Sequence, residues 1–183
     1  MVCNINWGFN LTKVMHPCPC GYYTDPKRAR RCYPSKIARY MEKISGPLLD
    51  RIDIHIELPS IRYQELIDTK DAESSAAIKA RVEKARTIQR ERFKSEGIFY
   101  NAQMSTKLIK KYCILEEETR ELLRMAMTEL GLSARAYDKV LKVSRTIADL
   151  GGKAAIEAHH ICISTHFCFR KKLIWHRYNP HIK

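Results

Sequence analysis

Apolar and polar positions along the chain change their pattern near residue 60, from mixed helix and strand signals to helical signals alone. Before that point, apolar residues at helical spacing predict a helix that Ser35 caps and that ends at Ser45-Gly46. Residues 52–58 alternate apolar and polar side chains with the period of two that is typical of a strand, and Pro59 ends this strand. The amino-terminal part is therefore expected to contain both helix and strand.

Beyond residue 60 the spacing of apolar residues predicts helices only. Ser74 or Ser75 is expected to cap a helix to about Phe93, Ser105 a helix through Tyr112, and Ser133 a helix that ends at Gly151-Gly152, with a further helix over 116–130. The side chains expected on buried faces are, in chain order, Ile78, Val82, Ala85, Ile88, Gln89, Leu122, Leu123, Ala126, Met127, Tyr137, Val140, Leu141, Ser144, Ile147 and Ala148, with Met125 and Met127 as core filler.

The charge of the chain points to a polyanionic partner. There are 33 basic and 20 acidic residues, a formal net charge of +13, and 45% of the residues are apolar, enough for a core. Basic residues concentrate in 26–43, which forms either a patch that grips phosphate or a solvated helix face. The sequence has no apolar run that could span a membrane and no signal peptide in residues 1–15, so a cytoplasmic protein is expected.

The cysteines indicate a reducing compartment and one candidate metal site. Seven cysteines is an odd number for a disulfide framework. Cys18, Cys20 and Cys32 cluster in the sequence near His16, and these four side chains could supply the N and S donors of a zinc site. The Cys-Pro-Cys spacing is unusual for structural zinc, however, and the alternative is that these residues mark only an extended loop.

Arg51 is the first of two candidate phosphate ligands. It follows a short apolar turn, Gly46–Asp50, and leads directly into the predicted strand. An arginine held at such a boundary can offer five donors in a fixed fork to phosphate oxygens. The alternative is an ion pair with Asp50 or Asp53.

Arg135 is the second candidate. It lies in the first turn of the helix that Ser133 caps, where a positive charge opposes the helix dipole and where free backbone N–H groups favour an anion. This placement suggests a nucleotide phosphate at the same helix end. The alternative is an exposed arginine that reaches Asp138 or Glu129.

Four runs of residues resemble the signatures of one family, the Mg-chelatase-like AAA+ ATPases of the ComM/YifB group. They are Pro17–Tyr23, Ile44–His55, Asn101–Met104 and Gly131–Asp138, and the resemblance covers about residues 16–161. It implies a partial AAA+ P-loop NTPase module that is mainly α: the end of the α/β core over residues 1–60, then a helical lid over 61–161.

The resemblance also implies roles for single residues. Arg51 is expected to be an arginine finger that acts across a subunit interface, and Arg135 the second sensor of the γ-phosphate. The family's water-positioning asparagine, the first sensor, is replaced by His16, and a family cysteine is replaced by Arg30. The intact family protein is expected to use ATP and Mg²⁺, to assemble with neighbouring AAA+ subunits into a hexameric ring, and to remodel DNA.

Other parts of the module are absent from the sequence. The chain has no Walker A loop and no apolar strand ending in paired acids, so it is not expected to hydrolyse ATP by itself. Residues 162–183 carry no acid and no helical period, and we expect a basic tail unrelated to the family, produced by a frame change near codon 162 or serving as an anchor for nucleic acid. The other function that fits is a non-enzymatic basic module for nucleic acid, with or without zinc.

Overall fold

The computed structural model divides the chain into two compact units, Met1–Lys70 and Asp71–Lys183. It describes residues 2–5, 9–12, 14–16, 18–22, 32–43, 45, 48, 51–58 and 72–178. The predicted change of pattern near residue 60 lies outside the described residues.

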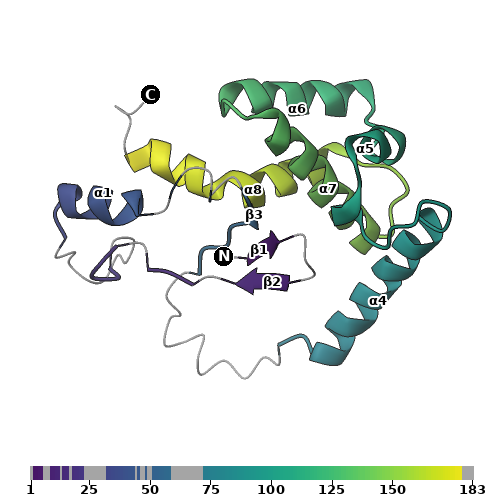
Figure 1. Ribbon diagram of the computed structural model, residues 1–183, viewed down its shortest axis with the longest axis horizontal. Helices are drawn as coiled ribbons and strands as arrows, with labels where there is room; N and C mark the ends of the chain where they lie inside the picture. Colours follow the sequence, from purple (N-terminus) through teal and green to yellow (C-terminus); the bar gives the residue numbers. More distant parts are fainter. Residues whose placement is uncertain are drawn as a thin grey trace. The chain divides into compact units, whose positions relative to one another are not determined.

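The first unit contains a small antiparallel sheet in the order β2-β1-β3 (Figure 1). Strands β1 (Val2–Ile5) and β2 (Phe9–Thr12) form a hairpin in the segment that shows no clean period in the sequence. Strand β3 spans Ile52–Ile54, so the expectation of a strand over 52–58 is wrong in length. Among the described residues, β3 pairs with Val2 and Cys3 at the start of β1, and residues 55–58 have no strand structure.

Helix α1 spans Pro34–Glu42 and is shorter than predicted. Its N-cap is Tyr33, which has an extended backbone and makes no capping hydrogen bond, so the cap predicted at Ser35 is wrong. Proline fits the first helical position because its fixed φ suits the helix and its missing N–H would be unpaired there anyway. Ser35 is therefore already inside the helix.

The second unit is helical throughout its described elements. These are α4 (Ser75–Arg92), the 3₁₀ helix η1 (Asn101–Gln103), α5 (Thr106–Tyr112), α6 (Glu117–Glu129), α7 (Ala134–Leu150) and α8 (Ala158–Tyr178). Three predicted caps are confirmed: the hydroxyls of Ser74, Ser105 and Ser133 each accept a backbone N–H three residues later, at 3.2, 3.4 and 3.3 Å. None of the described helices is long and apolar enough to cross a membrane.

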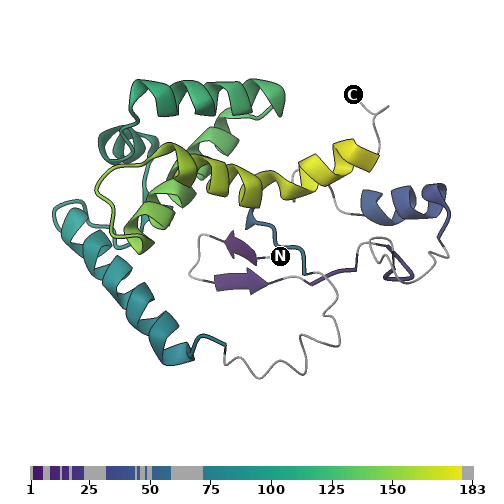
Figure 2. The same ribbon diagram turned by 180° about the vertical axis from the view of Figure 1, so that it is seen from behind.

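Helix α7 lies at the centre of this unit, in contact with α4, η1, α5 and α8, while α6 packs on α8 (Figures 1 and 2). The core contains Phe93, Leu123, Val140, Leu141, Ile156, Ile161 and Phe169. The protein as described is thus mainly helical, with a small α/β part before a helical domain, as the sequence predicts.

Four of the predicted buried side chains are exposed. Ile78 and Val82 are 42% and 38% exposed, because only the second half of α4 packs on the bundle while its first half extends away from the other helices of this unit (Figures 1 and 2). Met125 is 53% and Tyr137 39% exposed, so neither is a core residue.

Helix α8 continues past Cys162, so the expectation of a tail without helical structure is wrong for residues 162–178. The helix continues to Tyr178, and Ser164, Cys168 and Phe169 on it are buried. The Ser164 hydroxyl lies 2.6 Å from the Ser144 hydroxyl of α7 in the interior. A buried face with polar and small side chains gives a weak hydropathy period, which is why the pattern misses this helix.

Candidate functional site

Arg135 occupies the first turn of α7, and its side chain is exposed. The Ser133 hydroxyl caps this helix end by accepting the Ala136 N–H. Within the part of the chain that the structure describes, Arg135 makes no hydrogen bond or ion pair. Asp138 instead accepts a hydrogen bond from the Thr106 hydroxyl at 3.2 Å, so the predicted alternative pairing with Asp138 is not formed.

Arg51 immediately precedes β3, and its side chain is also exposed. Ile52, the next residue, is 1% exposed and fixes the backbone against the first unit. Among the described residues Arg51 has no ion pair; Asp50 lies outside them. The Leu48 N–H donates to the Ser45 carbonyl at 3.1 Å, which closes a turn just before this arginine.

Three cysteine thiols meet at the start of α1. The Sγ atoms of Cys18, Cys20 and Cys32 all lie within 4.8 Å of one another, and Cys18 and Cys20 are 3.2 Å apart. The hydrogen bond with Cys20 and the burial of the thiol raise the pKa of Cys32. The sequence therefore groups the three cysteines correctly, and their sulfur donors could hold a soft metal ion.

His16 is exposed and does not join the three thiols. Its imidazole lies beside Gly21, where a Cβ would be 3.5 Å from Nδ1. Gly21 has φ of +82° and closes a turn by donating its N–H to the Cys18 carbonyl at 3.0 Å. Residues 18–21 thus form a tight turn that favours glycine at its end.

A buried charged cluster in the second unit was not predicted. Asp149 at the end of α7 is 2% exposed, and its carboxylate accepts hydrogen bonds from Arg92 of α4, from Arg145 and from Asn101 of η1. Arg145 also donates to the carbonyls of Lys153 and Ala154 at 2.6 and 2.7 Å. This cluster joins three elements and the loop before α8, and we assign it a structural role.

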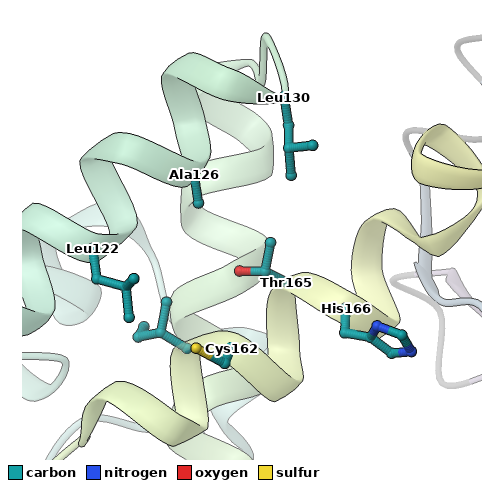
Figure 3. A pocket seen from close by; sticks show the side chains of 7 residues that line it. Leu122, Ala126, Leu130, Cys162, Thr165 and His166 are labelled. Atoms are coloured by element: carbon teal, nitrogen blue, oxygen red, sulfur yellow. The ribbon is translucent and has the colours of Figure 1, made fainter. Parts of the chain in front are cut away.

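A groove of about 320 Å³ lies between α6 and α8 (Figure 3). Leu122 and Ala126 of α6 face Cys162, Thr165 and His166 of α8 across it (Figure 3). None of the predicted site residues lines this groove.

Comparison with known proteins identifies the family. Residues 72–167 match the family model described as magnesium chelatase, subunit ChlI C-terminal, and residues 4–66 match the one described as magnesium chelatase, subunit ChlI. The chain belongs to the magnesium chelatase ChlI family. The boundary between the two compact units falls in the short gap between these two matches. Residues 162–167, which the sequence analysis assigns to an unrelated tail, lie inside the family match.

Individual ChlI-family relatives agree with the resemblance seen in the sequence. The chain is 42% identical over 154 residues to Competence protein ComM of Haemophilus influenzae, and 38% identical over 154 residues to YifB of Escherichia coli K12. Each match covers 84% of this chain and 29% of the relative. The predicted membership of the ComM/YifB group is therefore confirmed, and the chain spans about 29% of the length of these relatives.

The structure also explains one ComM/YifB signature in physical terms. In the run Asn101–Met104, the Asn101 amide donates to Asp149 at 2.8 Å and to Thr146 at 3.0 Å, and the Gln103 side chain accepts the Phe99 and Tyr100 N–H groups. Met104 is 2% exposed in the core. This signature therefore ties η1 to α7 within the helical domain.

Proposed function

We propose that this chain is the carboxyl-terminal part of an ATP-hydrolysing AAA+ module of the ComM/YifB type. In the assembled protein Arg51 acts as an arginine finger on the nucleotide of a neighbouring subunit, and Arg135 contacts the γ-phosphate as the second sensor. The exposed guanidinium of Arg135, unpaired among the described residues, is the observation that carries the proposal.

The environment of Arg135 favours an anionic ligand. A positive charge in the first turn of a helix is disfavoured by about 0.3–1 kcal/mol, because it meets the positive end of the helix dipole. Two other exposed arginines of this unit, Arg120 and Arg124, each bind a glutamate three residues earlier. A phosphate at the start of α7 would satisfy both Arg135 and the free N–H groups of that helix end.

Arg51 has the placement that a trans-acting arginine requires. Its side chain is exposed while the adjacent Ile52 is buried, so the guanidinium stands on a fixed backbone and can reach a neighbouring molecule. An arginine supplied in trans stabilises the charge of the phosphoryl-transfer transition state and is worth about 10³–10⁵ in rate.

The remaining assignments follow from the family. We propose that the complete protein binds ATP and Mg²⁺ through residues that this chain lacks, forms a hexameric ring and works on DNA in the cytoplasm, whereas this chain alone does not hydrolyse ATP. Support for a polyanionic partner comes from α1, where Lys36, Arg39 and Lys43 are exposed at positions that share one helix face. His16 replaces the first sensor and supplies no water-positioning amide.

A chimera tests the proposal. The matched segment of the Haemophilus influenzae ComM protein is replaced by this chain, and the ATP hydrolysis rate is measured for the chimera and its variants. Arg51→Ala is expected to lower the rate by about 10³–10⁵, and Arg135→Ala to lower it as well. Arg124→Ala in α6 is the control, because it removes an exposed arginine from the second unit without touching the proposed site. An inactive chimera beside an active parent, or variants no slower than this control, would contradict the proposal.

A further inference from the structure

Three sulfur atoms in the first unit are arranged as metal ligands. Cys18 and Cys20 come from one turn and Cys32 from the residue two positions before α1, so the group joins two separate segments of chain. Zinc bound to thiolates at about 2.3 Å in a tetrahedron places its sulfurs about 3.8 Å apart. The three sulfurs here lie within 4.8 Å of one another, with those of Cys18 and Cys20 3.2 Å apart, so small side-chain rotations would bring all three to that spacing.

The surroundings of the thiols favour a bound ion over a purely apolar cluster. Cys18 and Cys32 are 0% and 5% exposed, and Ile37 at 9% is the one other buried side chain of this cluster among the described residues. Three small side chains bury little apolar surface. Each Å² of buried apolar surface stabilises the fold by only about 25 cal/mol. A zinc–thiolate site contributes far more to folding in small units, since its ligands have no preformed arrangement in the unfolded chain.

The fourth coordination position is not filled by a described residue. No histidine or carboxylate in the described parts of the chain joins the three thiols, and His16 is exposed beside Gly21 instead. Cys20 is the partly exposed member of the group, so the cluster is accessible from solution on that side. A zinc ion with three protein ligands keeps an open position for water or another small donor.

We infer that Cys18, Cys20 and Cys32 bind one zinc ion as thiolates, and that the fourth ligand is exchangeable and comes from solution. The ion joins the Cys18–Gly21 turn to the start of α1, and it releases the three thiol protons when it binds. This site is independent of the proposed ATPase role, because none of the three cysteines is assigned a contact with the nucleotide.

Metal titration of the full chain tests the inference. The reduced, chelator-treated protein is titrated with Zn²⁺ in competition with a coloured chelator, and separately with Co²⁺ by absorption spectroscopy. We expect one ion per chain and a thiolate-to-cobalt charge-transfer band. Cys32→Ser is expected to weaken zinc binding by on the order of 100-fold or more, since even an outer partner of a metal ligand is worth 10–100-fold.

The matched control is Cys162→Ser, which removes an exposed cysteine from α8 and is expected to leave zinc affinity unchanged. Should Cys32→Ser fold poorly, Cys20→Ser replaces a less buried member of the group and carries the same expectation. A stoichiometry near zero, or an equal loss in the Cys162→Ser control, would overturn the site.

The cobalt form tests the open position separately. Added imidazole is expected to shift the cobalt d–d bands, because it replaces the ligand from solution, while His16→Ala is expected to leave the bands of the untreated form unchanged. If imidazole does not shift the cobalt bands, or if His16→Ala changes them, a protein side chain fills the fourth position and the inference of an open position is wrong.

Discussion

Replacing Asp149 by asparagine tests the most consequential packing feature of the helical unit. The carboxylate of Asp149 is buried, with Oδ2 at 2.8 Å from both Arg92 Nη1 and Asn101 Nδ2, and Oδ1 at 3.1 Å from Arg145 Nε. Asparagine keeps the shape of the side chain and removes its charge. It also replaces one acceptor oxygen by an N–H₂ group, which the guanidinium groups of Arg92 and Arg145 cannot accept because they only donate.

The cost of this change follows from the burial of the two guanidinium groups. The side chains of Arg145 and Arg92 are 3% and 15% exposed, so they remain beside each other without a counter-charge when Asp149 is neutral. Burial lowers the pKa of Arg145, although the group stays charged at neutral pH. Leaving a buried charge without its partner costs about 3–5 kcal/mol.

The assay is unfolding of the full chain by urea and by heat, followed by far-UV circular dichroism, which reports mainly on the helical unit. For a unit of this size the loss corresponds to a fall in Tm of roughly 10–20 °C. The control is Glu117→Gln, which breaks an exposed ion pair with Arg120 and is expected to cost less than about 1 kcal/mol. If Asp149→Asn were as mild as this control, the structural role assigned to the cluster would be wrong.

Three further changes have defined outcomes. His160 is 2% exposed, and its Nδ1 accepts the Glu157 N–H at 2.9 Å. Burial, and then the charge of His159, lowers the pKa of His160 from 6.5, so the unfolded chain binds the proton first and stability should fall as the pH drops below about 6.5. In urea titrations at several pH values, His160→Gln is expected to reduce this fall more than His159→Gln, which removes only the smaller cause. Ser133→Ala should lower the free energy of unfolding by about 1 kcal/mol, because it removes the hydroxyl that caps α7. Ser133→Asp is expected to keep the stability of the unaltered chain, since aspartate also caps helices. Leu123→Ala should lower the free energy of unfolding by about 2–5 kcal/mol, because Leu123 is buried, whereas Met125→Ala at an exposed position of the same helix should lower it by less than about 0.5 kcal/mol. Similar losses for both variants would contradict the orientation of α6.

The helix starts of the second unit were predictable because a cap is a local interaction. A serine hydroxyl that accepts an N–H three residues later needs no information from elsewhere in the fold, and this holds for Ser74, Ser105 and Ser133. At α1 there are two local signals for the helix start, Pro34 and Ser35. The prediction used Ser35 as the cap, whereas the helix begins at Pro34.

The buried charges could not be predicted from one helix alone. Arg145 and Asp149 are four residues apart on the face that α7 buries, but Asp149 is fully paired only because Arg92 and Asn101 arrive from α4 and η1. An i, i+4 pair of opposite charges inside an otherwise apolar face is the signal that was available. The exposure of Ile78 has the same cause: the sequence shows an apolar face on α4, and only the fold shows how much of that face is covered.

The candidate site was predictable as far as residue type and placement allow. The grouping of the three cysteines is confirmed, and Arg51 and Arg135 are exposed at the element boundaries that the sequence indicates. Their roles toward a nucleotide stay predictions, because those roles depend on a phosphate cradle and a neighbouring subunit.

Complementation between subunits tests the central claim most directly. A full-length ComM protein whose own arginine at the position of Arg51 is replaced by alanine is mixed with this chain, and ATP hydrolysis is measured under conditions in which the two proteins co-purify. We expect the unaltered chain to restore part of the rate by supplying Arg51 to the neighbour's nucleotide, and Arg51→Ala to restore none. No restoration by the unaltered chain, or equal restoration by both, would rule out a trans-acting Arg51.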